Sequence, residues 1–458
     1  MILGLLIAAS ASATPLQLTE VLRETTTRVP LILEAREKRR VALAELQMNQ
    51  GAFDTKLKAK TMNQFENKYD NQQWEARLEQ QTSFQGLSLY AGQRQGTGLY
   101  PVYDQKLESS SVGELFAGVD IPLLRNRDMD EPRLAREQAR AGSHMAEIEL
   151  QQKSLDIALK TGEIYWKWVA NGLKLRILED WVRIAEERQG MLEKKVKLGD
   201  VSVITLTDNQ RSLSKRQADL IKIRREFIVL SEELALYLGT APPNLERVPL
   251  DFSLSNDRTT APAQTQRDSL PAFRWLKIQQ QLLRQEERFA RALRLPQLNL
   301  AIEGARDLGR PPNTQTDPDQ LRAGLFLEIP LENNKGRGKV AQVNAKLQAL
   351  HHRATWLERE WQTRIEQNKV ALSTTRQQLE LQDLEVDAAK KMASAEARRL
   401  QQGDSDVFFV NLREQDEADA RIRLVETKSL HEIMVLERQS LDGELLQTLA
   451  LKPSKESL

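Results

Sequence analysis

Apolar residues recur at every seventh position along two long stretches of the chain. The spacing holds in the second half at Ile365, Leu372, Leu379, Val386, Ala393 and Leu400, and in the first at Leu206, Leu213, Leu220, Phe227 and Leu234. A sustained heptad predicts long helices that pack along one narrow seam, as in a coiled coil. Before Leu206 in the first half, Ala158, Gly162 and Gly172 lie on a similar seam, where small residues permit close helix contact. The run from Pro132 to Leu198 would be about 100 Å long as one helix.

Shorter stretches alternate between apolar and polar residues. Leu115, Ala117, Val119 and Ile121 alternate with Glu114, Phe116, Gly118 and Asp120, and the second half repeats the pattern with Ala323, Leu325, Leu327 and Ile329. A period of two predicts strands with one apolar and one mostly polar face. We also expect strands near 53–62 and 297–305, an extra β-hairpin within 75–92, and an exposed loop that carries Tyr100 and Tyr103.

The same order of elements occurs twice. Ile121-Pro122-Leu123 recurs as Ile329-Pro330-Leu331, and Leu198-Gly199-Asp200 recurs as Gln402-Gly403-Asp404. Matches in the same order and at similar spacing predict a tandem duplication. The expected first repeat is 14–240, with strands at about 51–122 and a helical hairpin at about 132–240 whose tip is 199–202. After a linker at 241–269, the expected second repeat is 270–450, with strands at about 296–331, a hairpin at about 339–450 and its tip at 403–406.

Each tip contains residues that favour a sharp turn between two helices. Gly199 and Gly403 suit the position after a helix, where the backbone commonly has a positive φ. Ser202 and Asp406 are expected to cap the returning helices. Helix capping alone and a role in docking another protein are both compatible with the candidate tip residues Gly199, Asp200, Ser202, Gly403, Asp404 and Asp406.

Composition narrows the class of protein. The 458 residues have a net charge of +1 and 5% aromatic content, and the mean hydropathy is −0.52. These values favour long solvated helices and give no reason to expect a nucleic-acid partner. The chain has no cysteine, which excludes disulfides, thiolate metal sites and Cys lipidation. Residues 1–13 have the apolar run and Ala-x-Ala ending of a signal peptide. The usual basic start of a signal peptide is missing, so we expect that the sequence is truncated there. At the other end of the chain, we expect a C-terminal tail at 451–458.

No other segment offers about 18 consecutive apolar residues, so entry into a membrane would require a closed β-barrel. The smallest membrane barrels need about eight strands, which is more than the strands of one chain are expected to supply. Oligomerisation would then provide the missing strands.

The sequence predicts no enzyme: we find no catalytic, cofactor-binding or metal-ligating set of residues. Lys335-Gly336-Arg337-Gly338-Lys339 resembles a phosphate loop, but Asn333 and Val340 stand where that motif needs Gly and Ser or Thr. A strand-to-helix turn is therefore the favoured interpretation. His351 and His352 lack a third ligand at helical spacing, which favours a solvated face.

Lys56, Lys58 and Lys60 share one face of a predicted strand. Two interpretations are open for this face. It is a hydrophilic surface that faces a lumen or lies outside the membrane, or it is a cationic ring that tunes the passage of anions.

The duplication, the Ile-Pro-Leu motif before each long helix and the Gly-containing tips together resemble the TolC family of outer-membrane factors. The resemblance implies a mainly α-helical protomer of a homotrimer, with a 12-stranded membrane β-barrel and a helical barrel in the periplasm of a Gram-negative bacterium. It also implies a tip that meets a periplasmic adaptor protein, and through it an inner-membrane pump. Phe408 and Phe409 stand near the place where relatives carry polar gate residues, so they are candidates for an apolar constriction.

The expected function is that of an outer-membrane exit duct for a tripartite efflux pump or a type I secretion system. The alternative is a periplasmic coiled-coil adaptor or a structural scaffold without a pore. The adaptor is disfavoured because it would normally carry one helical hairpin rather than two copies of strands and hairpin.

Overall fold

A computed structural model describes residues 14–65, 70–100, 108–250, 264–310 and 319–449 of the chain. The expected signal peptide at 1–13, Tyr103, residues 251–263 of the expected linker and the tail at 451–458 lie outside the described residues.

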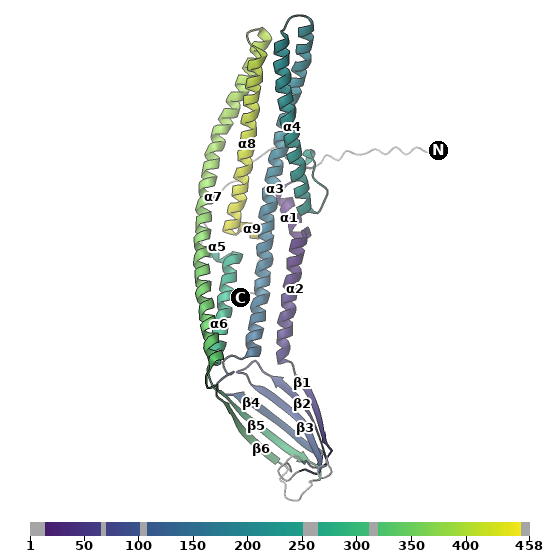
Figure 1. The fold of residues 1–458 in the computed structure, drawn as a ribbon, viewed down its shortest axis with the longest axis vertical. Coiled ribbons are helices and arrows are strands. Elements are labelled where there is room, and N and C mark those ends of the chain that lie inside the picture. The colour runs from purple at the N-terminus through teal and green to yellow at the C-terminus, as the bar shows by residue number, and fades with distance from the viewer. Residues whose placement is uncertain (1–13, 66–69, 101–107, 251–263, 311–318, 450–458) are drawn as a thin grey trace, which may run out of the picture. The chain divides into compact units, whose positions relative to one another are not determined.

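Both halves of the chain show helix, strands and a long helical hairpin in the same order (Figure 1). The first half contains α1 (Leu18–Arg28), α2 (Pro30–Gln50), the 3-10 helix η1 (Gly51–Phe53), β1 (Lys56–Gln64), β2 (Asn71–Gln81), β3 (Ser88–Gly98), β4 (Gly113–Pro122), α3 (Glu131–Lys197) and α4 (Val203–Leu238). After the 3-10 helix η3 (Leu245–Arg247), the second half contains α5 (Gln264–Ser269), α6 (Pro271–Ala292), β5 (Gln297–Leu308), β6 (Asp319–Glu328), α7 (Asn334–Gln402), α8 (Val407–Asp442) and α9 (Glu444–Thr448). The long helices α3 and α7 have 67 and 69 residues, and the returning helices α4 and α8 have 36 each.

The chain forms two compact units, and neither coincides with one half of the sequence. A helical unit takes the described residues of Met1–Arg36, Glu149–Pro271 and Leu357–Leu458. A sheet unit takes those of Glu37–Ile148 and Ala272–Trp356. Each unit therefore combines segments from both halves.

The sheet unit contains one antiparallel sheet of six strands, in the order β1-β2-β3-β4-β5-β6. β4 pairs with β5, with Val119 opposite Ile302, so strands from the two halves form a single sheet. The predicted extra hairpin is confirmed as β2 and β3, whose turn is closed where the Thr82 amide donates to the Leu87 carbonyl at 2.8 Å. The prediction of an exposed Tyr100 is wrong. Its side chain is buried and its hydroxyl donates to the Gln72 carbonyl at 3.2 Å, an arrangement that lets an aromatic residue bury its ring without losing a hydrogen bond.

The two faces of the sheet differ in chemistry, as the alternation predicts. Residues directly opposite each other in antiparallel strands share a face. One row runs from Leu57 through Leu78 to Leu321, and these side chains are 73%, 52% and 80% exposed. The neighbouring row on the other face starts with Lys58 opposite Arg77. The apolar face of this sheet is thus the one that the chain itself leaves exposed.

Seam residues such as Phe227 and Leu234 form the core of the helical unit together with Trp168, which lies next to the predicted seam of α3. Trp168 and Leu234 are fully buried, and the Trp168 ring stacks on Phe227 with centroids 5.9 Å apart. Leu372 and Leu379 are 2% and 4% exposed, which confirms the heptad of α7. No helix among the described residues has both the length and the apolarity needed to cross a membrane.

Small residues allow the helices to approach closely. A Cβ atom added to Gly162 would lie 2.2 Å from Leu436 Cδ2 of α8. One added to Gly172 would lie 2.6 Å from Val248 Cγ2, in the segment that follows η3, and 3.2 Å from Phe227 Cε2 of α4. All three distances are shorter than ordinary van der Waals contact, so the predicted role of these glycines in close packing is confirmed.

Candidate functional site

The two hairpin tips have the same backbone geometry. Gly199 and Gly403 both have a φ of +83°. Beyond each glycine an aspartate amide closes the last turn, where Asp200 donates to the Lys195 carbonyl and Asp404 to the Arg399 carbonyl, each at 2.9 Å. This pattern is the Schellman motif, which needs a left-handed residue and so favours glycine. No heavy atom lies within 4 Å of an added Cβ at either glycine, so conformation and not space selects the residue.

The predicted caps are confirmed. The Ser202 hydroxyl accepts from the Thr205 amide at 3.4 Å, and the Asp406 carboxylate accepts from the Phe408 amide at 2.9 Å. Asp200 and Asp404 lie before the caps, and both are exposed. Capping therefore accounts for Ser202 and Asp406, while Asp200 and Asp404 place negative charge on the outer surface of each tip.

Phe408 and Phe409 follow the cap of α8 and are 50% and 51% exposed. Their rings lie 5.6 Å apart at an interplanar angle of 78°. Their neighbours Val407 and Val410 are buried, so α8 directs the two rings away from its own packing partners. Their role in a constriction stays a prediction.

A buried charged cluster links the two hairpins behind the tips, and the sequence analysis missed it. Glu414 of α8 accepts from Arg216 of α4 at 3.1 Å and pairs with Arg188 of α3. The Asn411 side-chain oxygen accepts from both arginines, at 2.7 Å from Arg188 and 3.0 Å from Arg216. Arg216 is completely buried and lies over the Trp181 ring, 4.4 Å from its centroid. Burial lowers the pKa of Arg216, and the charge of Glu414 opposes that shift.

A signal for this cluster was present in the heptad. Three residues after Leu213 comes Arg216, a position that faces the same seam. A buried arginine at a seam position is expected to have a carboxylate partner. The sequence does not show which carboxylate this is, because Glu414 lies 198 residues further along the chain. Glu414 lies eleven residues after Gly403 and Arg188 eleven residues before Gly199, so the cluster fixes the two tips of the helical unit at the same end (Figure 1).

The lysines of β1 are paired with carboxylates of β2. Lys58 Nζ lies 2.7 Å from Glu79 Oε2, and Lys60 Nζ lies 2.9 Å from Glu75 Oε2. Arg77 lies between the two glutamates and donates to Glu79 at 2.7 Å. Lys56 is directly opposite Glu79 in the ladder. The lysines thus belong to a mixed-charge surface, and that arrangement does not support a purely cationic ring.

Four more charged side chains, one from each of β3, β4, β5 and β6, form a network of ion pairs on the same face of the sheet. Arg94 pairs with Glu114 and donates to Glu303 at 2.8 Å. Arg322 donates to Glu114 at 2.8 Å and to Glu303 at 2.9 Å. Each arginine contacts both glutamates, so these charges also compensate one another.

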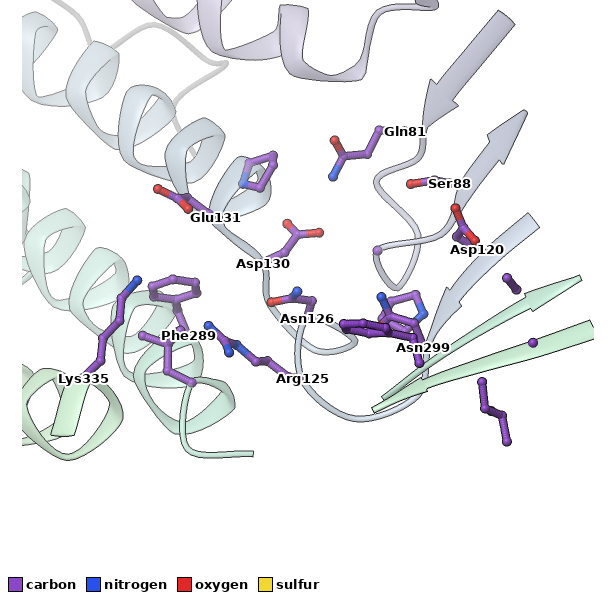
Figure 2. Close-up of a pocket in the computed structure, with 18 residues that line it drawn as sticks. Gln81, Ser88, Asp120, Arg125, Asn126, Asp130, Glu131, Phe289, Asn299 and Lys335 are labelled. Carbon is purple, nitrogen blue, oxygen red and sulfur yellow. The ribbon is translucent and has the colours of Figure 1, made fainter. Parts of the chain in front are cut away.

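A cavity of about 650 Å³ lies at the ends of the strands, beside the starts of α3 and α7 (Figure 2). Asn126, Asp130 and Lys335 are among its lining residues. Arg133 donates to the Asp130 carboxylate at 3.0 Å and to the Arg127 carbonyl at 3.2 Å. The acidic group is therefore engaged in holding the strand-to-helix turn.

Gly336, in the first turn of α7, serves close packing. A Cβ on Gly336 would lie 2.4 Å from Asn333 Oδ1 and 3.0 Å from the Leu293 carbonyl oxygen. Asn333, at a φ of +52°, precedes the helix and donates to the Arg294 carbonyl at 2.8 Å. Residues 335–339 thus lie at the start of α7, and the strand-to-helix turn that the sequence favours is the segment just before it, which ends at Asn333.

Comparison with solved structures identifies the fold. The chain is similar to the outer membrane protein VceC of Vibrio cholerae, with 13% identity, a TM-score of 0.64 and coverage of 93% of this chain and 96% of that one. It is also similar to the CmeC outer membrane channel of Campylobacter jejuni, with 12% identity, a TM-score of 0.67 and coverage of 93% and 85%. The chain has the outer-membrane-factor fold. The open-state MtrE outer membrane channel of Neisseria gonorrhoeae shares this fold, with 10% identity, a TM-score of 0.66 and coverage of 93% and 88%.

No family model matches the sequence, and no curated protein matches it. The outer-membrane-factor fold is thus preserved here at 10–13% identity to these three structures.

Proposed function

We propose that the chain is an outer-membrane channel, the exit duct of a tripartite efflux pump or a type I secretion system. The observation that carries the proposal is the sheet, with an exposed apolar face that includes Leu57 and Leu321 and a charged face that includes Lys58 and Glu79. Membrane β-barrels alternate in this way, with apolar side chains toward lipid and polar ones toward the lumen.

The two ends of the sheet support assembly from several copies. β1 and β6 are at the two ends of the strand order, and an edge strand presents backbone groups that pair with another chain. We propose a homotrimer, in which β1 of one copy pairs with β6 of the next. Outer-membrane lipid would cover the apolar face, and the helical part would extend into the periplasm of a Gram-negative bacterium.

The two tips are the proposed docking surface for a periplasmic adaptor protein, which would connect the duct to an inner-membrane pump. Gly199, Asp200, Gly403 and Asp404 are exposed at one end of the helical unit and present carboxylates there. Replacing Gly403 by valine should impair adaptor crosslinking while leaving trimer assembly and outer-membrane insertion intact, because the change strains only the turn. Normal crosslinking and export in that variant would contradict the tip assignment.

The alternative, a pore-free adaptor or scaffold, predicts different behaviour. Cell fractionation and mass measurement in mild detergent distinguish the two. The duct should be recovered from the outer membrane as a species of three times the mass of the mature chain, and reconstituted protein should conduct ions. A stable monomer with full strand content, found outside the membrane, would overturn the proposal.

A further inference from the structure

The sheet holds more strands than the resemblance implies. Three identical chains that form a 12-stranded barrel would contribute four strands each, whereas the described residues of this chain form a sheet of six. The two additional strands are β2 and β3, the hairpin of the first half, which the second half lacks among its described residues.

The hairpin is part of the sheet and not a loop attached to its end. β2 pairs with β1 from Asn71 opposite Gln64 to Glu79 opposite Lys56. β3 pairs with β4 from Ser88 opposite Asp120 to Arg94 opposite Glu114. In a closed barrel made from this sheet, the hairpin would therefore form part of the wall.

Both hairpin strands have the side-chain pattern of a wall. Leu78 and Ala91 are opposite each other and lie in the apolar row that contains Leu57. Glu79 and Tyr90 are opposite each other on the charged face. A hairpin that covered the outside of a barrel, or crossed its lumen, would not need this alternation in register with both neighbours.

We propose that the assembled duct has an eighteen-stranded barrel, six strands from each of three chains, and that β2 and β3 determine its width. This inference rests on the trimeric channel proposed above. With strands about 4.8 Å apart and tilted by about 40°, eighteen strands give a backbone radius of about 18 Å, against about 12 Å for twelve. The cross-section of the strand section is then roughly doubled, which matches barrels that enclose an open aqueous channel. The strand section admits bulky solutes, such as large polymers, that a 12-stranded barrel of this kind would exclude.

The strand order allows a deletion that tests the role of the hairpin. β1 and β4 run in opposite directions, because three successive antiparallel pairings, β1 with β2, β2 with β3 and β3 with β4, separate them. Deleting residues 71–98 removes β2 and β3 and leaves β1 and β4 able to pair, so that three chains form twelve strands. Phe84→Ser is the matched control, because it changes the exposed turn of the same hairpin and removes no strand.

The experiment combines imaging and polymer exclusion. Electron cryomicroscopy of the wild-type trimer should show eighteen strands. In planar bilayers, polyethylene glycols added on the side of the strand section should enter the wild type and Phe84→Ser at larger hydrodynamic radii than they enter the deletion variant. The exclusion radius should fall to roughly two thirds of the wild-type value in the deletion variant, as the backbone radius of the barrel does.

Three results would be decisive against the inference. Twelve strands in the wild-type image, with the hairpin outside the wall, would overturn it and leave the channel intact. An unchanged exclusion radius in a deletion variant that still forms trimeric pores would overturn it as well. Wild-type protein that inserts into bilayers but forms no pore would overturn the proposed function itself, and the inference with it.

Discussion

Single side chains hold the two hairpins of the helical unit together. Glu414 is the one carboxylate in the cluster that Arg188 and Arg216 share, and Asn411 supplies the other acceptor. One residue of α8 thus fixes both helices of the first hairpin. Arg216 is completely buried, so water cannot replace this charge as its partner.

Glu414→Gln should lower the free energy of unfolding by about 3–5 kcal/mol, because it leaves two arginines buried without a counter-charge. The measurement is the denaturant midpoint of the helical circular-dichroism signal in detergent. Glu179→Gln is the control: Glu179 pairs with Arg224 at 3.1 Å, both side chains are well exposed, and its loss should cost less than about 1 kcal/mol. Equal midpoints for the two variants would show that the buried cluster does not hold the hairpins.

At this scale the sequence predicts residues whose role is local. Gly403 and Asp406 were identifiable because a turn and a cap depend on neighbours a few positions away. Tyr100 and Glu414 were not, because burial in the first case and pairing with Arg216 in the second depend on segments far along the chain. The lysines of β1 were predictable in part. Their shared face follows from the local alternation, but the glutamates that neutralise them come from the next strand.

Helices and strands follow closely from the pattern of apolar positions. The heptad predicted the buried side of α7, and the alternation predicted the two faces of the sheet, including the hairpin β2–β3. The number of strands per chain was not predictable in the same way, because nothing in a hairpin's own sequence says whether it joins a larger sheet. That depends on pairing with β1 and β4.

Substitution by alanine should destabilise the protein at a tip glycine and stabilise it at a glycine inside a helix. Gly403→Ala should cost about 1–2 kcal/mol, because a side chain disfavours a positive φ. Gly190→Ala, inside α3 and with open space around its added Cβ, should stabilise by about 0.5–1 kcal/mol. Thermal unfolding of the two variants beside the wild type tests the difference in sign. If Gly403→Ala were neutral, the left-handed turn would not be required.

The seam of α7 should be protected from solvent. Leu372→Cys should resist maleimide, whereas Ser373→Cys, one position away and exposed, should react rapidly. The chain has no native cysteine, so the labelling is unambiguous. Leu372→Ala should also cost about 2–5 kcal/mol of stability through the cavity it leaves. Equal labelling at both positions would contradict the packing of α7.

Across the whole molecule, the charged face of the sheet should discriminate little between anions and cations. Opposite charges about 3 Å apart largely cancel at distances beyond the Debye length of about 8 Å. Glu75→Gln with Glu79→Gln should shift the ratio of potassium to chloride permeability toward chloride, and Lys58→Gln with Lys60→Gln should shift it toward potassium. The quadruple variant should return to the wild-type ratio in planar bilayers.

Arg306→Gln is the control for that cycle, because Arg306 is opposite Leu115 on the apolar face and its loss should leave the ratio unchanged. A quadruple variant that kept the shift of the lysine variant would show that the lysines act as an uncompensated cationic ring.

The interleaving of the two sequence halves has a consequence for the gene. Although the order of elements is written twice, β4 of one half completes its pairing only with β5 of the other, and Glu414 of the second hairpin neutralises Arg216 of the first. Either half expressed alone would have an incomplete sheet; the first would leave Arg216 without its carboxylate, and the second would leave Glu414 without its arginines. The two halves of the chain are therefore mutually dependent, so a gene split between residues 240 and 270 should yield half-chains that recover the fold only when they are co-expressed.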